Sequence, residues 1–111
     1  MTTDKTELGN ARAFIARHGK EIRFCPAEGQ WYVWSGHRWE VDDTCIVDRL
    51  YQQFVDDLHD QAVRESVDQT RDAAIRWWKQ SASNKGISAA MSLAKKQKQI
   101  IVTPDMFDRQ D

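Results

Sequence analysis

Six lysine and arginine side chains in the C-terminal part of the chain have the spacing that best fits a chemical role. Residues 73–104 contain six cations and no Asp or Glu, so this stretch has a net charge of +6. Clustered cations bind the phosphates of nucleic acids without reading the base sequence. We therefore predict a DNA-binding surface made of Arg76, Lys79, Lys85, Lys95, Lys96 and Lys98.

The preceding stretch has the opposite charge. Residues 40–72 carry a net charge of −7, although the whole chain carries only −1. A chain divided in this way can present a basic face to an anionic partner while it stays near neutrality. Two alternatives remain open. In the first, the two stretches neutralise each other across the fold. In the second, Lys95, Lys96 and Lys98 stabilise the negative end of the dipole of the last predicted helix.

The loop expected before that helix offers another kind of phosphate contact. Asn84 and Lys85 are predicted to lie in it, beside Gly86. Backbone N–H groups at a helix N-terminus bind phosphate well. We therefore expect a phosphate to be able to approach the helix at this point.

Five tryptophans in 111 residues are many, and three of them fall within predicted strands. Aromatic side chains exposed on a sheet stack on unpaired bases. They also bury a large apolar area where a small sheet meets helices, and we expect this for at least two of the three. Trp77 and Trp78 are flanked by cations, a combination that suits a nucleic-acid backbone with some stacking. Trp34 and Trp78 are our candidates for stacking or for an interface.

Motifs for catalysis are missing from the sequence. There is no phosphate-binding GxxxxGK[ST] loop and no GxGxxG turn, and His18, His37 and His59 do not follow metal-ligand spacing. Adjacent acids such as Asp56 and Asp57 point about 100° apart on a helix and do not converge on one atom. We predict no catalytic residue, metal or cofactor. A small nuclease that uses clustered Asp residues with Mg²⁺ is the enzymatic alternative.

Hydrophobic periodicity predicts the elements of the first part of the chain. Apolar residues at helical spacing predict a helix over residues 7–18, with Thr6 as its N-cap and Gly19 as its C′ residue. Runs of aromatic and β-branched residues separated by Gly-containing turns then predict a three-stranded antiparallel β-meander. Its strands are expected in residues 21–26, 30–34 and 38–41.

The rest of the chain is expected to be mainly helical. Residues 42–44 supply a cap for a helix that ends near residues 63–66, and Asp68 caps the next helix. Residues 81–84 separate this helix from the last one, and Pro104 is expected to stop any helix after a short extended run. The predicted fold class is α+β, with an N-terminal helix, the meander and a bundle of about three helices.

The length fits a single accessory domain over residues 1–111, with the helix and meander in 1–43 and a mainly helical part in 44–111. No apolar run reaches the roughly 18–20 residues that a membrane span needs, and the N-terminus has no apolar signal region. Cys25 and Cys45 match no CxxC pattern, which indicates a reducing, cytoplasmic compartment.

An ordered set of aromatic, glycine and polar residues carries a family resemblance. The set ends in a W-x-x-W-x-G-x-x-W motif, and residues 91–108 add a helix followed by a V-x-P-x-x-F-D stretch. It resembles the N-terminal domain of phage and plasmid (poxvirus-like) primase-helicases, the region that precedes a superfamily 3 helicase domain. Residues 44–90 match this family only in helical character. The matching residues are Asn10, Phe14, His18, Gly19, Arg23, Phe24, Pro26, Gly29, Trp31, Trp34, Gly36 and Trp39.

The resemblance implies a non-catalytic accessory region of a replicative primase-helicase, which positions DNA or neighbouring domains around a hexameric motor without hydrolysing ATP. The family continues towards the helicase, whereas this chain stops shortly after Asp108, which implies an excised domain or a standalone product.

Our first functional hypothesis is accordingly a replication module that contacts DNA nonspecifically through its basic helical region. The alternative is a protein-interaction or oligomerisation module without direct DNA contact. In this alternative the acidic helix expected within residues 42–65 and the basic stretch meet the helicase domain or other subunits.

Overall fold

The computed structural model describes residues 5–108, and for Phe107 and Asp108 the backbone alone. A helix comes first, a three-stranded sheet follows, and several helices complete the chain. The predicted α+β fold class is therefore confirmed. No helix within residues 5–108 is both long and apolar enough to cross a membrane.

Helix α1 spans Glu7–His18 and begins at the predicted cap. The Thr6 hydroxyl oxygen accepts a hydrogen bond of 2.9 Å from the backbone N–H of Gly9. Gly19 follows the helix, but as its C-cap rather than as the predicted C′ residue, and its φ of −60° is right-handed. Glycine is needed here for another reason, because a Cβ would lie 2.5 Å from the carbonyl oxygen of Ile15.

The predicted meander is confirmed. Antiparallel strands β1 (Ile22–Cys25), β2 (Gln30–Trp34) and β3 (Trp39–Val41) follow one another in the sheet. Phe24 pairs with Trp31 across the first two strands, and Trp34 pairs with Trp39 across the second two.

The two faces of the sheet differ sharply in burial. Ile22 and Phe24 point into the core, where they are 0% and 8% exposed. The alternation of side chains along a strand places Trp34 and Val41 on the opposite face, where they are 44% and 41% exposed. The helices therefore pack against one face of the sheet.

Helix α2 spans Ile46–Val63, which agrees with the predicted end. The carboxylate of Asp42 caps it from four residues before its start, because its two oxygens accept hydrogen bonds of 2.8 Å from the N–H groups of Ile46 and Val47. The formal cap position is Cys45, which has a φ of 61° and no side-chain cap.

Helices α3 (Asp68–Ala82) and α4 (Asn84–Ala94) are separated by Ser83. The Ser83 hydroxyl oxygen accepts a hydrogen bond from Gly86 N–H at 3.0 Å and so caps α4. The predicted cap of α3 is wrong. Asp68 is the first helical residue, and its carboxylate pairs with Arg71 rather than with a backbone N–H.

The C-terminal segment returns to the sheet. After the short 3₁₀ helix η1 (Lys98–Ile100), the N–H of Val102 donates a hydrogen bond of 3.0 Å to the carbonyl of Phe24. Pro104 then begins helix α5 (Pro104–Asp108), so our expectation that it stops any helix is wrong. The first helical position tolerates proline, because no hydrogen bond within the helix needs its N–H.

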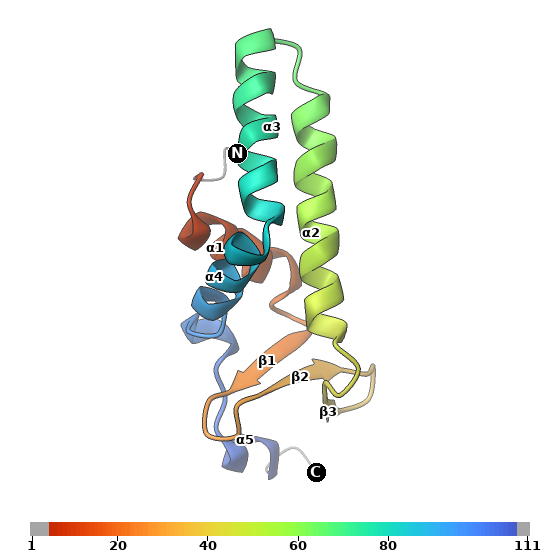
Figure 1. Cartoon of the computed structure of the whole chain (residues 1–111). Helices are drawn as coiled ribbons and strands as arrows, with labels where there is room; N and C mark the ends of the chain where they lie inside the picture. Colours follow the sequence, from red (N-terminus) through yellow and green to blue (C-terminus); the bar gives the residue numbers. More distant parts are fainter. Residues whose placement is uncertain (1–4, 109–111) are drawn as a thin grey trace.

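The molecule is elongated, with extents of 53 × 25 × 24 Å. Figure 1 shows α2 and α3 as a long antiparallel hairpin, with the sheet at the opposite end and α1 and α4 between. The core joins α1, α2, α4 and the inner face of the sheet around Phe14, Ile22 and Tyr51. Helix α3 adds little to it, since Ser81 is its one buried residue in the described chain.

Candidate nucleic-acid interface

The six predicted DNA-binding cations lie on three consecutive segments of the C-terminal half. Arg76 and Lys79 belong to α3, Lys85 to the first turn of α4, and the last three follow the end of α4. Every one of the six side chains is exposed to solvent. The structure therefore leaves these charges accessible to a partner.

Carboxylates do not neutralise this group within residues 5–108. The ion pairs found there involve other cations, such as Arg17 with Asp57 on α2 and Arg71 with Asp68. The acidic helix α2 thus pairs with α1, and none of the six cations of the basic stretch has a carboxylate oxygen within 4 Å in this part of the chain. Neutralisation of one stretch by the other therefore does not occur by ion pairing.

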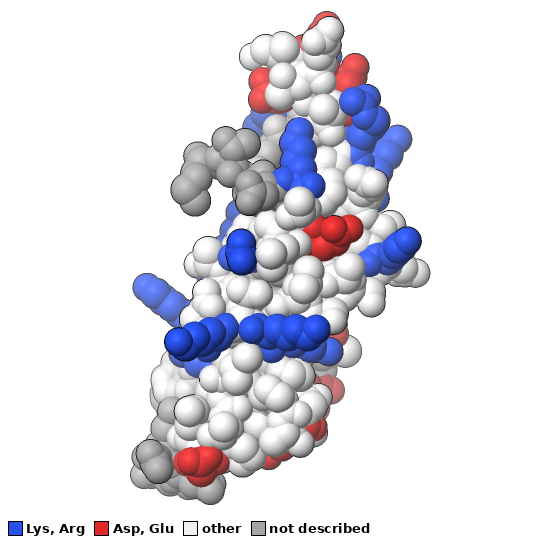
Figure 2. All heavy atoms as spheres, turned by 90° about the vertical axis from the view of Figure 1, so that its left-hand side faces the viewer, with Lys and Arg blue, Asp and Glu red and all other residues white. Residues whose placement is uncertain are grey.

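Figure 2 shows the side of the molecule that lies on the left in Figure 1, where α1, α3 and α4 are found. Lysine and arginine side chains are spread over the upper and middle parts of this side. They form a dense row across the middle of the molecule, just above the end that contains the sheet. Single carboxylates lie between them, so the positive surface is broad but interrupted.

The end of α4 holds its lysines on a fixed backbone. The N–H groups of Lys95 and Lys96 donate to the carbonyls of Met91 and Leu93, each at 3.1 Å. The Lys95 ammonium lies 5.4 Å from the ring centre of Phe24, in cation–π geometry. These lysines also lie at the negative end of the α4 dipole, which their charges complement.

The loop predicted for Asn84 and Lys85 is wrong, and the phosphate approach beside Gly86 stays a prediction. Asn84 and Lys85 are in the first turn of α4 rather than in a loop. The N–H of Gly86 is already bonded to Ser83, and a Cβ at this glycine would lie 2.1 Å from the carbonyl oxygen of Gln80. The start of α4 is thus packed against the end of α3, although the Lys85 side chain stays exposed.

The two tryptophan candidates differ in their surroundings. Trp78 is half-buried and packs against the core, and its ring centre lies 4.5 Å from that of His59. Its indole N–H has no hydrogen-bond partner in the described chain. Trp34 is 44% exposed on the outer face of the sheet. Trp31 and Trp39 are half-buried, so the sheet has one strongly exposed tryptophan.

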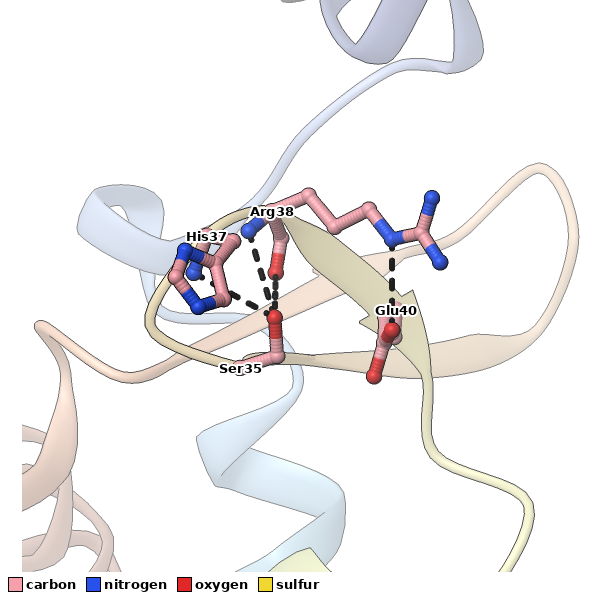
Figure 3. Close-up of polar contacts among 4 residues, drawn as sticks. All are labelled: Ser35, His37, Arg38 and Glu40. Carbon is pink, nitrogen blue, oxygen red and sulfur yellow. Dashed lines mark hydrogen bonds and ion pairs between the residues drawn. The ribbon is translucent and has the colours of Figure 1, made fainter.

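A tight turn fixes the end of the β2–β3 hairpin beside Trp34 (Figure 3). The hydroxyl oxygen of Ser35 accepts hydrogen bonds from the N–H groups of His37 and Arg38, and the hydroxyl donates to the Arg38 carbonyl. Gly36 has a φ of +101°, a conformation that favours glycine. The Arg38 side chain folds back along the strand to Glu40, at 3.2 Å.

Arg23 is a residue that our sequence reasoning missed. Its guanidinium lies 4.6 Å from the ring centre of Trp39 and donates hydrogen bonds to the carbonyls of Gly19 and Ile22. Burial lowers the pKa of this guanidinium below its ordinary value. The sequence alone held only half of this signal, because alternation along β1 places Arg23 on the face of Trp34 only when the strand register is known.

The residues considered for metal-assisted chemistry do not gather in the part of the chain that the structure describes. No group of three or more His, Cys, Asp or Glu side chains in that part is placed to hold a metal ion. The clustered Asp residues of the nuclease alternative therefore do not form a candidate magnesium site there.

The fold and the surface together define a small α+β domain. It carries the exposed cations of the basic stretch and a β2–β3 hairpin with Trp34 and Trp39. The protein family described as "D5 N terminal like" matches residues 11–111. The chain belongs to this family, the N-terminal regions of D5-like phage and plasmid primase-helicases. Neither the curated proteins nor the solved structures contain a match.

Proposed function

We propose that residues 1–111 are a non-catalytic accessory domain of a primase-helicase and that the domain contacts DNA nonspecifically through its basic stretch. The exposure of six cations without a carboxylate partner in residues 5–108 is the observation that carries this proposal. Family membership supplies the replication context. Arg76, Lys79, Lys85, Lys95, Lys96 and Lys98 would bind phosphates, so the affinity would fall steeply with salt.

Catalysis and ATP hydrolysis would belong to other parts of the replication machinery. The role of this domain would be to hold DNA, or to position the helicase domain and other subunits. Cys25 and Cys45 are both free thiols, which supports a reducing compartment, and the proposal places the domain in the cytoplasm.

The decisive experiment is fluorescence-anisotropy titration of single- and double-stranded DNA at two salt concentrations. We expect the triple variant Lys95→Glu, Lys96→Glu, Lys98→Glu to bind much more weakly and to reduce the slope of log K against log salt by about 2–3 on duplex DNA. The matched control is Arg49→Glu, Arg64→Glu, Arg71→Glu, which changes the net charge equally on the α2–α3 hairpin.

Two outcomes would count against this site. Unchanged affinity in the lysine triple variant would remove those lysines from the interface. An equal loss in the arginine control would show that net charge alone drives binding. Thermal melts of all variants establish that each protein is folded.

A second function has its own structural support. The α2–α3 hairpin extends far from the sheet, its α2 side is acidic, and Val63 and Val67 at its tip are 47% and 55% exposed. An acidic, partly apolar projection suits a contact with a neighbouring subunit. Sedimentation velocity separates the two functions, because a stable oligomer without DNA affinity would favour the interaction module.

A further inference from the structure

The outer face of the sheet presents aromatic surface at the end opposite to the helical hairpin. Trp34 and Trp39 face each other across β2 and β3, with ring centres 5.4 Å apart and planes inclined at 60°. Val41 continues this face and is 41% exposed. The helices pack on the other face, so Trp34 keeps a large part of its ring open to solvent.

A fixed cation completes this aromatic pair. The Arg23 guanidinium lies over Trp39, and two backbone carbonyls, those of Gly19 and Ile22, hold it in place. The turn between the tryptophans is also fixed, by the hydrogen bonds of Ser35 (Figure 3). A ligand that stacks on Trp34 would therefore meet a preorganised surface and would lose little free energy in ordering it.

The basic stretch reaches the same sheet. Helix η1, which begins with Lys98, packs along β1, the strand that carries Arg23. The Lys95 ammonium lies 5.4 Å from the ring centre of Phe24 on this strand, on the inner face of the sheet. The described structure thus places cations that suit a phosphate backbone beside β1, and an open indole ring on the outer face of the same sheet.

From this juxtaposition we infer that the Trp34–Trp39–Arg23 surface stacks an unpaired base of a single-stranded nucleic acid. Bases in a duplex are covered by their neighbours, whereas unpaired bases offer a free face to aromatic side chains and to guanidinium groups. This inference rests on the proposed function, because the lysines beside β1 would hold the backbone of the same nucleic-acid strand. It adds a preference for single strands, which phosphate contacts alone do not supply.

The test compares a labelled single-stranded oligothymidylate with a duplex of equal length, using Trp34→Ala, Trp34→Tyr and Val41→Ala. We expect Trp34→Ala to weaken single-strand binding by about 5- to 100-fold and to change duplex binding less than about twofold. Trp34→Tyr keeps an aromatic face and should retain most of the affinity. Val41→Ala, on the same face without a ring, is the matched control.

The outcomes separate this inference from the proposed function. If Trp34→Ala binds single strands as well as the unchanged protein does while the lysine triple variant loses affinity, the stacking surface is wrong and the basic interface stands. If Trp34→Ala weakens single and double strands equally, or Trp34→Tyr fails to restore binding in a folded protein, stacking is also excluded. If the unchanged protein binds neither nucleic acid, both proposals fall.

Discussion

Asn10, Tyr51 and Ser81 are polar residues in the most buried part of the molecule, on α1, α2 and α3. The side-chain amide of Asn10 donates a hydrogen bond of 3.0 Å to the Ser81 hydroxyl oxygen, which ties the end of α3 to α1. The Tyr51 hydroxyl and the Asn10 Oδ1 have no hydrogen-bond partner among the described residues. A buried polar atom without a partner costs about 1–3 kcal/mol, so this cluster lowers stability while it fixes the helix contact.

Tyr51 makes the folded state sensitive to alkaline pH. Burial raises the pKa of Tyr51 from 10 to about 12, and the Asn10 side chain lowers it by less than burial raises it. The unfolded chain ionises at the lower pH, so the free energy of unfolding is intact below pH 10 and falls between pH 10 and 12, by about 2–3 kcal/mol. We expect Tyr51→Phe to remove most of this loss in urea titrations at several pH values, and to leave the stability at pH 7 unchanged or higher.

Tyr32 provides the control for this prediction. A hydrogen bond to Glu28 raises the pKa of Tyr32 to about 12 as well, but this side chain is only half-buried. Solvent screening should make Tyr32→Phe remove a smaller part of the alkaline loss. An alkaline profile that Tyr51→Phe leaves unaltered would contradict the assignment to the buried tyrosine.

At the scale of elements, helix α2 depends on a carboxylate outside it. The two oxygens of Asp42 accept hydrogen bonds from the N–H groups of Ile46 and Val47, which have no partner within the helix. We expect Asp42→Ala to lower the free energy of unfolding by about 1–2 kcal/mol in urea titrations. Asp43→Ala is the control, because Asp43 is exposed and should change stability by less than about 0.5 kcal/mol. Equal losses at the two positions would refute this role of Asp42.

Periodicity was sufficient to predict the order and type of the elements, because apolar spacing reflects which face each one buries. Helix ends were harder to predict. Residues 42–44 were predicted to supply the cap of α2, but the local pattern did not indicate that Asp42 would reach the helix from four residues away, past the left-handed Cys45. Pro104 fits the start of a helix as well as a stop, and the sequence does not decide between them.

The candidate site was predictable only in part. The charge count found the six exposed cations, since a stretch without acids has no local ion-pair partner. Whether the acidic stretch would cover them depended on the tertiary fold, in which Asp57 pairs with Arg17 instead. The position of Arg23 over Trp39 depends on strand register. The close packing of Gly86, at the start of α4, depends on how α3 meets α4.

At the scale of the whole molecule, the packing is uneven along its length. The core lies between the sheet and the α1–α4 layer, while the far half of the α2–α3 hairpin rests on contacts between the two helices. Few buried side chains mean a low local free energy of opening. We expect amides in residues 64–75 to exchange hydrogen faster than those of α1 and α4, measured by mass spectrometry at neutral pH. Uniform protection would show that the hairpin opens only with the whole fold.

The 53 Å length of the molecule, about twice its width, also sets how it rotates in water. An elongated body turns end over end more slowly than it spins about its long axis. The backbone N–H bonds of α2 and α3 point along that axis, because helical N–H groups are parallel to their helix (Figure 1). Their nitrogen-15 nuclei therefore sense the slower tumbling, and their ratio of transverse to longitudinal relaxation rates exceeds that of N–H bonds set across the axis.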